Sequence, residues 1–143
     1  ITVGLTIVLA NEVALYTKLR KFHWNVAGNN FMEFHKLFER HYKTIESYID
    51  EVAERIGKLG SPVIGTMLEF EKITTINEHP GKFPMAQEML SELLEDHESI
   101  IIEVRKEIEQ CSSKYNDAGT ADFLTGLMES HETMSWILRR YLN

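Results

Sequence analysis

The sequence has few of the residues that build disulfide frameworks or interrupt regular structure. Its 143 residues include one cysteine, three prolines and eight glycines. A single cysteine, Cys111, cannot pair within the chain, so we expect no disulfide and a reducing, cytoplasmic location. Hydrophobic residues still make up 43% of the chain. That content and this length predict one domain with its own core over residues 1–143.

Long apolar runs and an excess of basic residues are also missing. The opening segment ITVGLTIVLANEVALYTKLR has no basic leader and soon contains Glu12, Lys18 and Arg20, so we expect neither a signal peptide nor a membrane span. The formal net charge is −7, which disfavours attraction to DNA phosphates. Two interpretations of the acidity remain: it attracts cations, or it only maintains solubility.

Amphipathic helices account for most of the chain. Apolar residues recur at three- and four-residue steps, which is typical of helices that bury one face, and no segment shows the alternation of a strand. We expect long helices over residues 3–26, 31–59, 84–115 and 120–142, and a short one within VIGTMLEFEKI. The pattern predicts an all-α, ferritin-like four-helix bundle with a long crossover between the second and third helices. An up-down bundle without metal is the alternative.

The second helix carries the pattern best suited to metal chemistry. His35, Glu39, Asp50 and Glu54 lie on it, and His23 lies at the end of the first helix. At about 100° per residue, the four fall within a sector of about 100°, centred about 130° from the apolar stripe. They therefore point out of their own bundle. Imidazole and carboxylate together suit iron, manganese and zinc, although a solvated charged face would look the same in the sequence.

These residues of a single chain cannot bind one metal ion together. His35 and Asp50 lie about 22 Å apart along the helix at about 1.5 Å per residue. If the same helix of a second subunit packs antiparallel around residues 43 and 44, His35 of one chain meets the region of Asp50 and Glu54 of the other. Two equivalent sites related by a dyad would result.

Other patterns with chemical meaning are absent. No Glu lies three residues before a His, so we expect no di-iron centre inside the bundle. There is no HExxH, CxxC, Gly-rich phosphate loop or nucleophile elbow. The remaining histidines lack ligand-spaced partners and are assigned no chemistry: His41, His79, His97 and His131. Trp24, next to His23, would relay or quench an oxidising equivalent, or else serve as packing.

The segment FHWNVAGNNFMEFHKLFERHY, followed by IDEVAERIGKLGSP, resembles the Dps family of miniferritins. The likeness consists of His23-Trp24, Gly28, Phe31, His35, Asp50 and Glu54-Arg55 at the family's spacing, and NDAGTADFL extends it toward the last helix. The resemblance implies a hollow dodecamer that oxidises Fe(II) at dimer interfaces and stores ferric mineral inside. It also implies that His23 and His35 come from one subunit and Asp50 and Glu54 from its dyad mate.

The same resemblance covers pores, oxidant and partners. Asp117 and Asp122 match acidic positions that line the threefold pores, whereas Gly126 replaces a further acidic residue. Glu39 stands where family members commonly have Asp, and it is a candidate ligand or base. Hydrogen peroxide is the oxidant that the resemblance favours, although the residues themselves do not choose it over oxygen. A DNA-compacting or structural shell with non-redox interface metals is the alternative, but residues 1–143 lack a Lys-rich extension.

Overall fold

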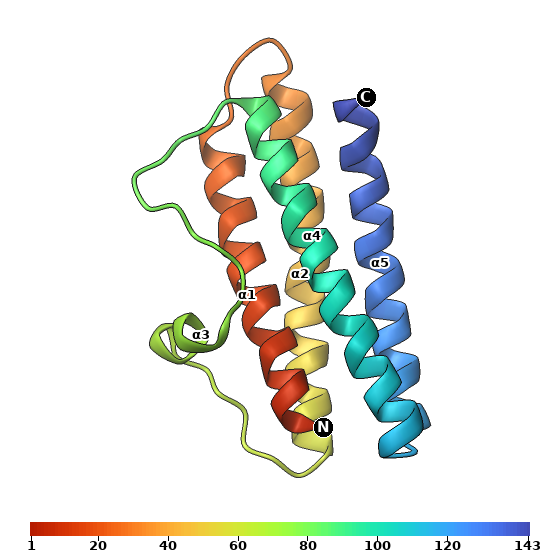
Figure 1. The fold of residues 1–143 in the computed structure, drawn as a ribbon. Coiled ribbons are helices and arrows are strands. Elements are labelled where there is room, and N and C mark those ends of the chain that lie inside the picture. The colour runs from red at the N-terminus through yellow and green to blue at the C-terminus, as the bar shows by residue number, and fades with distance from the viewer.

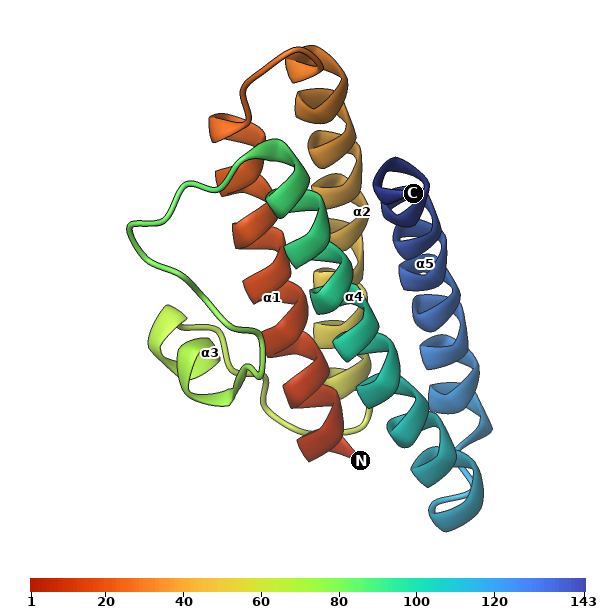
Figure 2. The same cartoon turned by 45° about the horizontal axis from the view of Figure 1, so that its top comes forward.

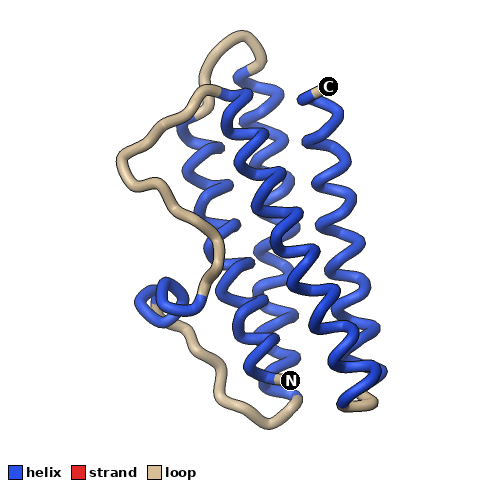
Figure 3. Tube along the Cα trace, in the orientation of Figure 1, coloured by secondary structure: helices blue, strands red, loops and turns tan.

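A computed structural model describes residues 1–143. Four long helices run side by side: α1 (Thr2–Asn25), α2 (Phe31–Lys58), α4 (Ala86–Glu109) and α5 (Ala118–Leu142) (Figure 1). A short helix, α3 (Met67–Ile73), lies beside α1 in the crossover from α2 to α4. Helices and loops make up the whole chain (Figure 3). The predicted all-α bundle, with its long second connection and short helix, is confirmed.

The helix ends lie within two residues of the predicted ones, except that α4 ends at Glu109 rather than near residue 115, and they have local causes. Gly28 takes φ 111°, a left-handed conformation that favours glycine, in the turn between α1 and α2. α5 begins two residues before its predicted start because Asp117 caps it: Asp117 Oδ1 accepts a hydrogen bond from Thr120 N at 3.0 Å. α4 continues into one π-helical turn, η1 (Gln110–Lys114), and Asn116 at φ 53° then reverses the chain.

The core lies along the bundle axis and consists of one apolar stripe from each long helix. The apolar stripe of α2 is buried at Phe34, Phe38, Ile45, Val52 and Ile56, whereas Tyr48 is only half-buried. Each such side chain contributes about 1.5–3 kcal/mol when it is removed from water. In this way the amphipathic pattern fixes which face of α2 turns inward and which remains for other contacts.

Two polar side chains of α1 attach the crossover to the bundle. Asn11 Oδ1 accepts hydrogen bonds from the Thr74 hydroxyl at 2.7 Å and from Thr75 N at 2.8 Å. Lys18 Nζ donates to the carbonyl oxygen of Asn77 at 2.8 Å and lies 2.7 Å from Asp96 Oδ2 on α4. The crossover and α3 therefore follow the side of α1 in both ribbon views (Figure 2). None of the helices is long and apolar enough to cross a membrane.

Candidate metal centre

His23 and His35 form a close pair where the turn brings α2 back beside α1. Their rings stack with centroids 3.7 Å apart and planes 13° from parallel. His23 is buried, at 7% exposure, and His35 is half-buried. The ring of Tyr42 meets the edge of His23, and Phe31 stacks on His35. Aromatic contacts on both sides thus hold the two imidazoles in place.

The backbone determines which nitrogen of each ring is free. His23 Nδ1 lies 2.6 Å from the carbonyl oxygen of His35, and His35 Nδ1 lies 2.7 Å from the carbonyl oxygen of His23. A carbonyl only accepts hydrogen bonds, so both Nδ1 atoms carry the proton. In the neutral rings the lone pair is then on Nε2, which is the arrangement of a metal-binding histidine oriented by its other nitrogen.

The predicted carboxylates lie on the outer surface of α2. Asp50 and Glu54 are exposed and Glu39 is half-buried, with its side chain 3.9 Å from Lys43 Nζ. Their outward orientation is confirmed. Within the single chain, no group of three or more His, Cys, Asp or Glu side chains is placed to hold a metal ion. The sharing of a site between His35 and the carboxylates of a second subunit stays a prediction.

Trp24 lies at the end of α1 and is 64% exposed. Its ring is 5.5 Å from the guanidinium carbon of Arg20, which also lies over the ring of Tyr42 at 4.6 Å. The indole therefore does not pack in the core of its own chain, although the packing alternative would place it there. It is left on the surface next to the histidine pair.

The chain is similar to known proteins along nearly its whole length. A family model of the ferritin-like domain matches residues 4–143. A low temperature-induced protein of Nostoc sp. is 42% identical over 134 residues, which cover 94% of this chain and 75% of that protein. DNA protection during starvation protein 2 of Bacillus anthracis is 36% identical over 135 residues, with 94% and 91% covered. Dps from Thermosynechococcus elongatus superposes with a TM-score of 0.95 at 30% identity, over 99% of this chain and 89% of that one.

The chain belongs to the Dps family of ferritin-like proteins. The resemblance carried by the histidine segment is therefore confirmed at the level of the family.

The two predicted pore carboxylates of this Dps-family chain have different surroundings. Asp117 accepts hydrogen bonds from the Thr120 hydroxyl at 2.6 Å and from Thr120 N, and Arg55 Nη2 of α2 lies 3.5 Å away. These hydrogen bonds from Thr120, more than the nearby Arg55, hold the pKa of Asp117 below its ordinary value. Asp122 is exposed on the first turns of α5. Asp117 thus has a structural role as a helix cap that its sequence position did not reveal.

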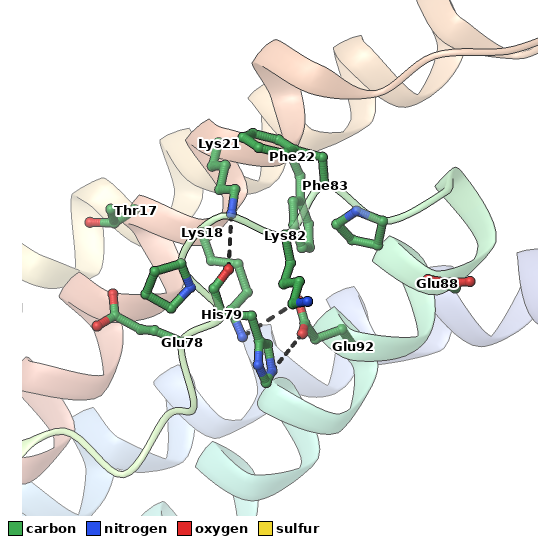
Figure 4. A pocket seen from close by; sticks show the side chains of 12 residues that line it. Thr17, Lys18, Lys21, Phe22, Glu78, His79, Lys82, Phe83, Glu88 and Glu92 are labelled. Atoms are coloured by element: carbon green, nitrogen blue, oxygen red, sulfur yellow. Dashed lines mark hydrogen bonds and ion pairs between the residues drawn. The ribbon is translucent and has the colours of Figure 1, made fainter.

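A pocket of about 640 Å³ lies between α1, the crossover and the start of α4 (Figure 4). Lys18, Lys21 and Lys82 face His79 and Glu92 across it. Glu92 is already engaged, with its oxygens 2.9 Å from His79 Nε2 and 3.7 Å from Lys18 Nζ. Because lysines and glutamates both line the pocket, its charge does not select one class of ligand.

Sequence analysis missed a second group of titratable residues, which lies inside the bundle. Glu12, His41, His97 and His131 come from α1, α2, α4 and α5 respectively, and none is more than 2% exposed. A signal was present, because each occupies a position of its helix's apolar stripe, three or four residues from buried Leu, Ile, Phe or Met side chains. A charged or polar residue at such a position is expensive to bury without partners.

Proposed function

We propose that this protein is an iron-oxidising and iron-storing miniferritin whose oxidation sites are shared between subunits. Ferrous iron is the substrate. His23 and His35 of one chain supply imidazole donors, and Asp50 and Glu54 of the neighbouring chain supply carboxylates. The observation that supports this proposal most is the reciprocal hydrogen bonding of the histidine pair to backbone carbonyls, which directs each Nδ1 inward and leaves each Nε2 free.

The distribution of donors on α2 explains why a second chain is needed. The histidine pair lies where the end of α1 meets the start of α2, whereas Asp50 and Glu54 lie exposed near the end of α2. An antiparallel neighbour about a dyad brings the start of one α2 to the end of the other, so that each dimer has two equivalent sites. We propose that such dimers assemble into a dodecameric shell. The buried, unpaired Cys111 is consistent with work in the reducing cytoplasm.

Few protein donors at each site leave room for water and an oxidant. Hydrogen peroxide accepts one electron from each of two ferrous ions and leaves as two hydroxide ions, so no hydroxyl radical forms. Glu39 lies one helical turn from His35 on the same face of α2 and would act as an additional ligand or as a base. Exposed Trp24, next to His23, would take up a stray oxidising equivalent. Asp117 and Asp122 would draw cations toward a pore.

Stopped-flow oxidation of Fe(II), with peroxide or oxygen supplied, tests the activity. His35→Ala should slow oxidation by at least about tenfold, because changes around metal-binding histidines cost about 10- to 100-fold. The matched control is His79→Ala, which removes an exposed histidine that pairs with Glu92, and it should oxidise iron at the unmodified rate. An unchanged rate for the His35 variant with both oxidants would remove this histidine from the mechanism.

A mixing experiment tests whether the site is shared. Subunits with His35→Ala are co-assembled with subunits carrying Asp50→Ala and Glu54→Ala, and each set is inactive alone. In a mixed dimer about a dyad, one site has lost both donor sets and the other is intact. Random pairing of equal amounts should then restore about a quarter of the full activity. If the mixture is no more active than its two parents, the site does not span two subunits.

A further inference from the structure

The bundle interior contains a cluster of four ionisable side chains, with one contributed by each long helix. Glu12, His97 and His131 have no exposed surface and His41 has 2%. Three of them form a chain of contacts. His131 Nε2 lies 2.6 Å from Glu12 Oε1, and His97 Nδ1 lies 2.8 Å from His131 Nδ1. The rings of His41 and His97 are 6.3 Å apart. Four helices thus bring nitrogen and oxygen donors to one region of the core.

Several polar atoms in this region have no partner. They are Glu12 Oε2, both ring nitrogens of His41, His97 Nε2 and the hydroxyl of Ser135, which follows His131 by one helical turn. These are all the unpartnered buried side-chain atoms of the chain. Folded proteins rarely leave such atoms unsatisfied, because each loses its hydrogen bonds to water on burial. Their concentration in one place points to a bound species that they contact together.

The charges of the cluster favour a cation. His97 Nε2 and both ring nitrogens of His41 make no hydrogen bond, so each ring has a nitrogen available to a cation. No Lys or Arg side chain forms an ion pair or hydrogen bond with Glu12, whose recorded partner is His131. A carboxylate buried in an apolar core needs a compensating positive charge nearby.

We propose that Glu12, His41, His97 and His131 bind one divalent transition-metal ion inside each bundle, separate from the sites on the outer face of α2. Three imidazoles and one carboxylate suit a borderline ion such as zinc, which takes four nitrogen and oxygen donors in a tetrahedral arrangement. With all four positions occupied by protein, the ion would hold the four helices together and leave no position for a substrate. A single carboxylate is also too few for the bridged pair of ions of a di-iron centre.

The side chains must rearrange to admit the ion. As they lie, they close on each other through hydrogen bonds and no three donors converge on one point. His131 contacts Glu12 through Nε2 and His97 through Nδ1, and one imidazole binds one ion through only one of these nitrogens. Binding therefore requires the ring of His131 to leave one of these two partners, and the other side chains to turn until their donors are about 3.3 Å from one another around the ion. The competing source of positive charge is a proton on His131, which would keep the closed arrangement.

Measuring the metal content of the assembled protein distinguishes a bound metal ion from a proton on His131. The starting variant carries His35→Ala and Glu54→Ala, which removes donors from the outer face. It is produced in zinc-supplemented cells, and its metal content is measured after dialysis against a weak chelator and again after equilibration with Co²⁺. We expect one ion per chain and the visible absorption of tetrahedral cobalt. Adding His97→Gln or His131→Gln should lower the content at least tenfold, whereas His79→Gln should leave it unchanged.

A conservative variant covers the case in which the histidine substitutions prevent folding. Glu12→Gln keeps the shape of the side chain and removes its charge, so it should weaken cobalt binding at least tenfold while the helical circular dichroism is retained. A strong chelator should lower the unfolding temperature of the starting variant and not that of its Glu12→Gln derivative. Fewer than about one ion per ten chains in the starting variant, under both loading conditions, would overturn the proposal in favour of the proton. So would a full complement of ions in both the His97 and Glu12 variants.

Discussion

Two groups of histidines in this protein differ in what holds their rings. In the outer pair, each Nδ1 of His23 and His35 bonds to a backbone carbonyl oxygen. In the interior cluster, His97 Nδ1 and both nitrogens of His131 bond to other ionisable side chains, whereas His97 Nε2 and both nitrogens of His41 have no partner. The outer rings are therefore oriented by the backbone of one chain and are ready for an external metal. The interior rings are oriented by each other, so a change at one of them affects the rest of the cluster.

The largest difference in unfolding temperature should appear when one histidine of each group is replaced by leucine. His131→Leu leaves the buried carboxylate of Glu12 without its partner, which typically costs about 3–5 kcal/mol and should lower the unfolding temperature by roughly 10 °C for a chain of this size. His35→Leu, at a half-buried position on the surface of α2, should cause a much smaller shift. Thermal unfolding followed by circular dichroism in a chelator measures both.

Replacing both Glu12 and His131 by apolar residues tests whether the unpaired charge causes the loss of stability. Adding Glu12→Met to His131→Leu removes the unpaired charge, so much of the lost stability should return, because apolar groups of similar volume often replace a buried ionic pair without loss. If His35→Leu and His131→Leu lower the unfolding temperature equally, the distinction between backbone-held and side-chain-held rings has no energetic basis.

Acid should destabilise the interior cluster more than the outer pair. Burial depresses the folded-state pKa of His97 well below the value of about 6.5 in the unfolded chain. The unfolded state then binds more protons as the pH falls, so the contribution of His97 is fully present above about pH 6.5 and declines below it. The unfolding temperature of the metal-free protein should fall between about pH 7 and pH 5.

The matched variants for the acid experiment are His97→Leu and His79→Gln. The first replaces a buried neutral ring and should flatten the dependence on pH, whereas the second changes an exposed ring and should leave the slope as it was. An equal slope in all three proteins would show that the acid sensitivity arises outside the interior cluster.

Substitutions at the start of α5 should change the stability of the protein by a smaller amount. Asp117→Ala removes the cap and should cost about 1 kcal/mol, or about 2–4 °C in unfolding temperature, in addition to slower iron uptake. Asp122→Ala removes an exposed carboxylate that caps nothing, so it should slow uptake without this loss of stability. Uptake is followed by mineral absorbance and stability by circular dichroism. An equal loss of stability in both variants would contradict the assigned cap.

The smallest signal should be DNA binding by residues 1–143. Their net charge is −7, so few counterions would be released from phosphates on contact. A gel-shift titration with plasmid near physiological salt should show little retardation, and lowering the salt to about 20 mM should not create it, because the longer electrostatic range also extends the repulsion between the acidic protein and the phosphates. Tight retardation at about 150 mM salt would show that a local basic surface outweighs the net charge.

The sequence by itself determined the helices and which faces of them are buried. The recurrence of apolar residues gave α2 its inward stripe, and glycine, asparagine and proline located the turns to within two residues of their positions in the structure. The outward orientation of Asp50 and Glu54 followed from the same periodicity, because a helix of known pitch fixes the angle between its residues. The histidine segment also identified the family.

Only the tertiary structure decided which residues from different helices meet. Periodicity places Glu12, His41, His97 and His131 on inward faces, but their common level depends on connection lengths and on the way the helices cross. The reciprocal bonds of His23 and His35 likewise depend on the path of the turn at Gly28. Periodicity describes one helix about its own axis, whereas a site is formed by distances between helices. Such distances arise only when the whole core packs.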